Sequence, residues 1–190
     1  MNKLDPPVLV TGDIILRKPT DADVPAIVRG CNDPLTLEWL SLLPRPYTEE
    51  RAREYVHDHA VQVTESGQGL ERAIEVDGAF AGVIGLKNTD WATRHTEVGY
   101  WLGPWARGRG VMTRALCCLV DWLFAEAGMR RVEIQVEPGN VASLAVAERA
   151  GFRQEGLLRH RGGFRDDHPV DLLMLSKLVG DSPATGSAHG

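Results

Sequence analysis

A short stretch rich in glycine and arginine, residues 97–113, constrains the fold of this chain more than any other. Residues 98–102 have the composition of a strand, and Pro104 must end it because proline has no N–H for a sheet ladder. The turn ARGRG follows at 106–110, and an apolar helical pattern begins at Val111. Helix N-termini leave backbone N–H groups free, and glycines let such groups converge on an anion. The stretch therefore predicts a phosphate cradle, with a plain strand-turn-helix connection as the alternative.

Size and composition favour a single globular domain, and they argue against binding to nucleic acid or to membranes. The chain has 190 residues, of which 43% are hydrophobic and 25% charged, as in ordinary globular proteins. A net charge of -5 without a long basic run argues against nucleic acid, and no run reaches the ~20 apolar residues of a membrane span. Cys31, Cys117 and Cys118 have no disulfide or metal spacing, which favours a reducing compartment. We therefore expect a cytoplasmic protein that binds neither nucleic acid nor membranes.

Helix and strand signals alternate around the glycine-rich stretch. Asp77-Gly78 between two apolar runs predicts a hairpin, because both turn positions require a positive φ. Residues 131–137 alternate apolar and polar side chains as a half-buried strand does, and a helical pattern separates them from 97–102. A strand, a helix and a second strand in this order form a crossover. We therefore expect these two strands to be parallel neighbours.

The complete set of expected elements covers most of the chain. Strands are expected at 14–18, 73–76, 79–86, 97–102, 131–137, 152–160 and 170–177. Helices are expected at 20–31, 48–65, 111–127 and 141–150. The proline-rich segment 37–47 is expected as an ordered loop, which either covers a cleft or lies on the core. Residues 1–179 then form one domain, and 180–190, small and polar, form a disordered tail.

The glycine-rich turn resembles a known family motif. Arg107-Gly108-Arg109-Gly110-Val111-Met112 resembles the pyrophosphate loop, Arg/Gln-x-x-Gly-x-Gly/Ala, of the GNAT superfamily of acyl-CoA-dependent N-acyltransferases. Met112 departs from that pattern, but the form Gly-Arg-Gly-Val-Met-Thr is similar to the RimJ/RimL branch, which acetylates protein N-termini and related amines. A Walker phosphate loop would need Gly-Lys-Ser/Thr at its end, which is missing here. The resemblance implies an α/β (α+β) GNAT fold with a mixed central sheet of about seven strands, a splayed parallel pair and about four helices.

The resemblance also assigns residues to an acetyl-CoA site. Backbone groups of Tyr100, Trp101 and Leu102 would bind the pantetheine arm, while core packing is expected for the side chains of Tyr100 and Leu102. Asn140 would contact the same arm and caps an expected helix, in an Asn-x-x-Ser pattern with Ser143. The diphosphate would lie on the backbone N–H groups of the turn and of the first helical residues, namely Arg107, Gly108, Arg109, Gly110, Val111, Met112 and Thr113.

Two residues are candidates for the chemistry of acyl transfer. Glu97 resembles the strand glutamate that serves as general base, usually through water, although a solvated carboxylate paired with Arg94 or His95 is the alternative. Ser143 resembles the serine that protonates the departing thiolate, with an ordinary capped helix as the alternative. Ala147 stands where many family members carry a tyrosine acid. No Cys/His cluster has metal spacing, so no metal is expected.

We therefore expect an acetyl-CoA-dependent N-acetyltransferase that acts on a primary amine by direct transfer. Its acceptor is either a peptide N-terminus or a small-molecule amine, such as an aminoglycoside or a polyamine. A non-catalytic acyl-CoA-binding module of the same fold is the alternative. The sequence leaves the acyl-chain length open, and a homodimer is plausible although no stretch indicates an interface.

Overall fold

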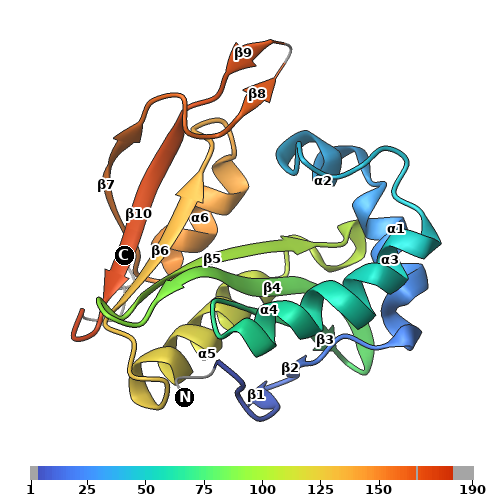
Figure 1. The fold of residues 1–190 in the computed structure, drawn as a ribbon, viewed down its shortest axis with the longest axis horizontal. Helices are drawn as coiled ribbons and strands as arrows, with labels where there is room; N and C mark the ends of the chain where they lie inside the picture. Colours follow the sequence, from blue (N-terminus) through green and yellow to red (C-terminus); the bar gives the residue numbers. More distant parts are fainter. Residues whose placement is uncertain (1–3, 166, 182–190) are drawn as a thin grey trace, which may run out of the picture.

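An eight-stranded mixed sheet forms the centre of the molecule, with helices on both faces (Figure 1). The computed structural model describes residues 4–165 and 167–181. The strands of the sheet, in spatial order, are β1 (Leu9–Thr11), β2 (Ile14–Arg17), β3 (Leu70–Val76), β4 (Ala79–Asp90), β5 (His95–Leu102), β6 (Arg131–Val136), β10 (Leu172–Leu178) and β7 (Arg153–Leu158). A separate hairpin consists of β8 (Phe164–Arg165) and β9 (His168–Pro169).

The helices follow the expected order, with two additions, the short helices at 34–39 and 104–106. They are η1 (Asp21–Asp23), α1 (Val24–Cys31), α2 (Pro34–Trp39), α3 (Glu49–Glu54), the π-helical η2 (Tyr55–His59), α4 (Ala60–Ser66), η3 (Pro104–Ala106), α5 (Val111–Ala125) and α6 (Val141–Arg149). The expected mixed α/β architecture is confirmed. The expectation of a loop throughout 37–47 is wrong at its start, because α2 continues to Trp39. The sheet has one strand more than expected, β1, and the hairpin β8–β9 was also missed.

The sheet contains the splayed parallel pair on which the site depends. The β3–β4 hairpin turns at Asp77 and Gly78, which have φ of 51° and 76° as this turn requires. Strands β5 and β6 are parallel, and their register pairs only 95–97 with 131–133. Both strands continue beyond these pairs, so their carboxyl ends diverge. This divergence leaves backbone groups on β5 available to a ligand.

Two clusters of buried side chains attach the helices to the faces of the sheet. The cluster under α5 and α6 includes side chains from β3 to β6 and is the larger of the two. In α5 the residues at i, i+3, i+4, i+7 and i+11 spacing are buried against it, namely Met112, Ala115, Leu116, Leu119 and Leu123. The second cluster joins α1 and α3 to the opposite face of β3 and β4. The packing of α5 fixes its N-terminus where β5 and β6 diverge (Figure 1).

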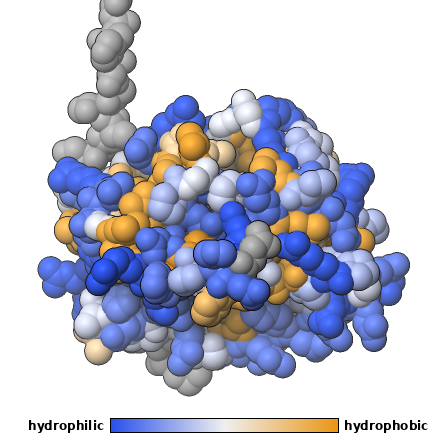
Figure 2. Space-filling model, turned by 90° about the horizontal axis from the view of Figure 1, so that it is seen from above, coloured by the Kyte–Doolittle hydropathy of each residue, from blue (hydrophilic) through white to orange (hydrophobic). Residues whose placement is uncertain are grey.

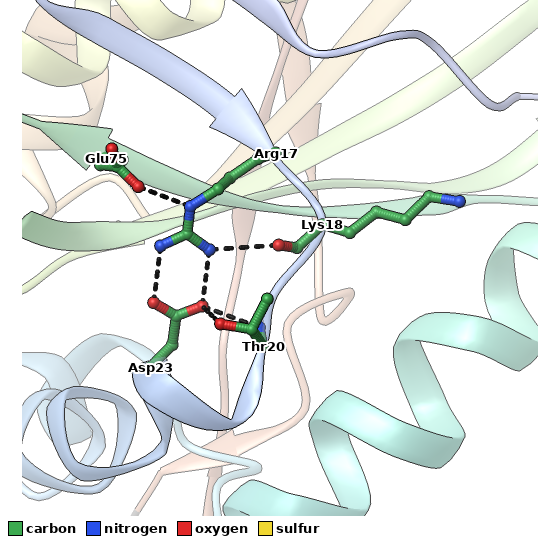
Figure 3. A network of polar contacts seen from close by, with 5 residues as sticks. All are labelled: Arg17, Lys18, Thr20, Asp23 and Glu75. Carbon is green, nitrogen blue, oxygen red and sulfur yellow. Dashed lines mark hydrogen bonds and ion pairs between the residues drawn. The ribbon is translucent and has the colours of Figure 1, made fainter. Parts of the chain in front are cut away.

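A buried ion-pair network joins the edge of the sheet to the start of α1 (Figure 3). Arg17 of β2 donates two hydrogen bonds to the Asp23 carboxylate, at 2.7 and 2.8 Å, and one to Glu75 of β3 at 2.6 Å. Asp23 also accepts from the N–H of Thr20, forming a capping box. Burial favours a raised pKa for Asp23, but the contacts with Arg17 and Thr20 outweigh it and lower the pKa.

The end of the chain is only partly described. Most of the expected disordered tail, 182–190, lies outside the described residues. Val179 and Gly180 form a turn, beyond which the Asp181 carboxylate accepts from the N–H of Leu178 at 2.9 Å. Within the described ranges, no helix is both long enough and apolar enough to cross a membrane.

Candidate functional site

The diverging strands open into a cleft of about 570 Å³. One wall is α2 with the segment that follows it, the floor is β5, and the other wall is the end of β6 with the start of α6. Seen from the side that carries α2 and the β8–β9 hairpin, apolar patches lie among mostly hydrophilic side chains (Figure 2). The expected site residues that border this cleft are Glu97, Tyr100, Trp101, Leu102, Arg107, Gly108, Met112, Asn140 and Ser143.

The glycine-rich turn has the geometry of an anion cradle. Helix α5 begins at Val111, so the N–H groups of its first turn have no acceptor within the helix. Its N-cap is Gly110, and no side chain caps this end. Gly108 and Gly110 have φ of 74° and 69°, and a Cβ at either position would meet nothing within 4 Å. The turn therefore offers free N–H donors beside open space, which is what a diphosphate needs.

The side chains of the other residues in 107–113 face different parts of the protein. Arg107 directs its guanidinium away from the cradle and binds Asp33 at 2.7 Å, Thr36 at 2.8 Å and the Leu102 carbonyl at 3.0 Å. Asp33 caps α2, so Arg107 ties the cofactor turn to a wall of the cleft. The exposed Arg109 lies 3.6 Å from Asp77, Val111 is buried, and Thr113 lines a separate hollow beside β1. Only backbone groups of these residues could serve an anion in this arrangement.

Glu97 lies on the floor of the cleft with 6% of its surface exposed. Its Oε1 lies 3.0 Å from the Lys87 ammonium, and its Oε2 accepts from the amides of Asn88 at 3.1 Å and Gln135 at 3.3 Å. The pairing with Arg94 or His95 that the sequence left open is not among these contacts. Neighbouring strands therefore hold this carboxylate in a polar setting that fixes its direction.

A hydrogen-bonded chain on the wall of the cleft joins Tyr100 of β5 to Ser143 and Asn140 at the start of α6. The Asn140 side chain accepts from the N–H of Ser143 at 3.1 Å, so the expected cap is confirmed. The Tyr100 hydroxyl lies 3.1 Å from Ser143 Oγ and 3.3 Å from its carbonyl oxygen. Burial raises the pKa of Tyr100 to about 12, and the contact with Ser143 opposes that effect. Core packing was expected for Tyr100, but its hydroxyl also orients the candidate acid.

Sequence reasoning missed several residues of the cleft. Lys87, Asn88 and Gln135 contact Glu97, and Trp39 and Glu137 line the same cleft. The alternation of 131–137 placed Gln135 and Glu137 on one face of the expected strand, which is the signal that could have found them, although β6 itself ends at Val136. Trp39 lies in the segment predicted to cover a cleft or the core, and it borders the cleft. Among residues 4–165 and 167–181, no group of three or more His, Cys, Asp or Glu could hold a metal.

Comparisons with known proteins agree with this geometry. The model of the acetyltransferase (GNAT) domain family matches residues 13–153. YdaF of Bacillus subtilis (strain 168), provisionally named a ribosomal N-acetyltransferase, is 33% identical over 146 residues, or 77% of this chain and 80% of YdaF. The ribosomal-protein-serine acetyltransferase of Escherichia coli (strain K12) is 27% identical over 132 residues, or 70% of this chain and 73% of that protein.

A solved structure of Mycobacterium smegmatis RimJ in complex with CoA-disulfide is also similar, with a TM-score of 0.81 and 26% identity. The similarity covers 90% of this chain and 84% of RimJ. The family match includes the splayed strands, the cradle and all of α6, which border the cleft. This chain therefore belongs to the GNAT acetyltransferase family and is an acyl-CoA-dependent N-acetyltransferase.

Proposed function

We propose that this protein transfers the acetyl group of acetyl-CoA to the N-terminal amine of a protein. The observation that carries the proposal is the placement of the anion cradle, Glu97 and Ser143 around one cleft at the splay of β5 and β6. N–H groups at the start of α5 hold the diphosphate, and backbone groups of 100–102 and the Asn140 side chain hold the pantetheine arm. The protein works in the cytoplasm, which agrees with its three free cysteines.

Glu97 and Ser143 perform the two proton transfers of the reaction from different parts of the cleft. Glu97 takes a proton from the acceptor ammonium, directly or through a water, so that the nitrogen lone pair attacks the thioester carbonyl carbon. A backbone N–H of β5 stabilises the negative charge that develops on the carbonyl oxygen. The carbon–sulfur bond then breaks, and Ser143, whose hydroxyl Tyr100 orients, donates a proton to the thiolate. The second proton that the nitrogen loses as the amide forms returns to Ser143. The products are an amide and free CoA.

Two findings favour a peptide N-terminus as the acceptor. The named relatives include the ribosomal-protein-serine acetyltransferase of Escherichia coli, and the similarity extends over 73% of that protein. The lips of the cleft also expose apolar side chains of a kind that contact peptides, with Leu35 at 43% and Leu42 at 94% exposure. A spermidine N(1)-acetyltransferase of the same organism is similar over only 47% of its length. A small amine is therefore the second candidate.

The test is acetyl transfer by the purified protein. We expect thiol release from acetyl-CoA in the presence of short peptides with free N-termini, and a mass increase of one acetyl group on the peptide amine. Gly110→Glu should abolish acetyl-CoA binding in calorimetry, because it places a carboxylate in the cradle. Gly110→Ala is the matched control, since it introduces the same backbone strain without charge. Acetyl-CoA binding without thiol release, with any peptide or small amine, would instead support a non-catalytic module.

A further inference from the structure

A guanidinium from the chain itself occupies the rim of the acceptor side of the cleft. Arg165, on β8, lies with its Nη2 atom 2.9 and 3.1 Å from the two carboxylate oxygens of Glu137. The same nitrogen donates to the backbone carbonyl of Glu38 at 2.7 Å. The guanidinium carbon lies 5.2 Å from the centre of the Trp39 ring. Arg165 therefore connects α2 to the end of β6 across the cleft.

The three groups around Arg165 would suit any ammonium or guanidinium ion. A carboxylate, a carbonyl oxygen and an indole face each attract such a cation, and they act more strongly where water is partly excluded. Glu137 is 15% exposed, and both Glu137 and Trp39 line the cleft. The Trp39 ring lies close to Gly139, where a Cβ would come within 3.4 Å of it. The contacts form a fixed, partly desolvated cation site.

The hairpin that supplies Arg165 is separate from the sheet that supplies Glu137. Strands β8 and β9 pair only with each other in the sheet topology of the described residues. Figure 1 shows this hairpin projecting from the main body at the end of the molecule where α2 lies. Its displacement would leave every ladder of the eight-stranded sheet intact, and it would uncover the Glu137 carboxylate to the cleft.

The cation site lies in line with the candidate base. Gln135 lies in β6 and Glu137 directly follows the end of that strand, so the two are two residues apart, which corresponds to about 7 Å of extended chain. Gln135 is hydrogen-bonded to Glu97, so Glu137 lies beyond the position at which Glu97 would receive the acceptor amine. A second positive charge a short distance from that amine would reach Glu137. A lysine or arginine side chain close to a peptide N-terminus meets this requirement, and so does one end of a diamine.

We infer that Glu137, Trp39 and the Glu38 carbonyl bind a second cationic group of the acceptor, and that Arg165 holds this subsite until the acceptor displaces it. The inference rests on the proposed function and adds the class of acceptor. Basic acceptors gain the charge contact, and they must compete with Arg165 for it. Neutral acceptors of the same size gain nothing from Glu137.

The test compares acceptors that differ in one charge. Two peptides carry lysine or its uncharged isostere norleucine at the second position, and putrescine against butylamine forms the small-molecule arm. In the pair of acceptors that the cleft accommodates, we expect kcat/KM to be about tenfold higher for the charged acceptor than for the uncharged one. One charge-assisted hydrogen bond allows a difference of this size. A preference within the peptide pair identifies a lysine side chain as the cation, and a preference within the small-molecule pair identifies a diamine.

Variants then assign the preference to the subsite. Glu137→Gln should remove the preference for lysine and leave the norleucine peptide unaffected, whereas Arg165→Ala should increase the preference several-fold. The exposed residues Glu148 and Arg149 of α6 supply matched controls, Glu148→Gln and Arg149→Ala, which should leave the preference unchanged. Should Glu137→Gln fail to fold, Arg165→Ala still carries the test.

Two results would overturn the inference, and they differ from failure of the proposed function. Equal kcat/KM for the charged and uncharged acceptors would show that the subsite does not select cations, while acetyl transfer itself would stand. An unchanged lysine preference in both Glu137→Gln and Arg165→Ala would place the selectivity elsewhere. Absence of transfer to every acceptor, despite acetyl-CoA binding, would remove the proposed function together with the subsite.

Discussion

Glu97 is the residue on which the proposed proton transfer depends. Its carboxylate is buried, and Lys87, Asn88 and Gln135 hold it in one direction. Glu97→Gln keeps the size of the side chain and one acceptor oxygen but removes the base. We expect kcat to fall by about 10²–10³, which is within the range of a general base. Steady-state thiol release measures kcat, and calorimetry should show an unchanged Kd for acetyl-CoA. A kcat within twofold of the parent would remove Glu97 from the mechanism.

Tyr100 and Ser143 are expected to act as a pair of hydroxyls. Tyr100→Phe removes only the oxygen that lies 3.1 Å from Ser143 Oγ. Because the hydroxyl of Tyr100 contacts Ser143 and Ser143 is the proposed proton donor, we expect Tyr100→Phe to lower kcat less than Ser143→Ala does. The double variant should be no slower than Ser143→Ala alone, since the two residues act through one proton donor. Single-turnover rates measure this, and additive losses would contradict the pairing.

At the scale of elements, α2 is tied to the cofactor turn by Arg107 and Asp33. Breaking this contact should loosen a wall of the acceptor cleft without altering the backbone cradle. We expect Arg107→Ala and Asp33→Ala to raise the acceptor KM by about three- to tenfold, as loss of a charged hydrogen bond allows, with acetyl-CoA affinity within about twofold. Kinetics and calorimetry check both values. Weaker acetyl-CoA binding in Arg107→Ala alone would mean that the guanidinium binds the diphosphate.

Local signals predicted most of the elements, and non-local contacts explain what they missed. Pro104, Gly110 and the alternation of 131–137 act on their own segments, so they predicted the strand end, the start of α5 and the strand β6. No helix was expected between 31 and 48, whereas Asp33 caps the short helix α2 there. The hairpin β8–β9 has only two residues in each strand, too few for a periodic pattern.

Local patterns also predicted some residues of the site, whereas contacts between distant segments could not be predicted. Glu97 and Ser143 could be predicted to share a cleft, because a motif and a crossover place them there, and both border it. The contact of Arg107 with Asp33 joins residues 74 apart in the sequence, and that of Arg165 with Glu137 joins residues 28 apart. The two residues of each pair lie in different segments of the chain, so no helix or strand pattern predicts the distance between them. Contacts of this kind depend on how the walls fold over the sheet.

For the molecule as a whole, the Arg17 network links stability to pH. The folded-state pKa of Asp23 is lowered, so the folded protein binds this proton less readily than the unfolded chain does. The resulting stabilisation is complete above the unfolded pKa of about 4 and is lost as the pH falls toward the lower folded pKa. The free energy of unfolding should therefore change little with pH between 5 and 7 on account of this group, and should decrease below pH 4.

Asp23→Asn separates this contribution from those of other acids. The variant leaves the Arg17 guanidinium without its buried partner, so we expect the free energy of unfolding at pH 7 to fall by about 2–3 kcal/mol. At pH 3 the difference from the parent should be smaller, because Asp23 of the parent is then partly protonated. Urea unfolding at pH 7, 5 and 3 measures both values, and the exposed Asp58→Asn serves as the control. A difference that stayed constant across the three pH values would mean that Asp23 stabilises the fold through packing and its cap, because a charged contact must weaken as the carboxylate is protonated.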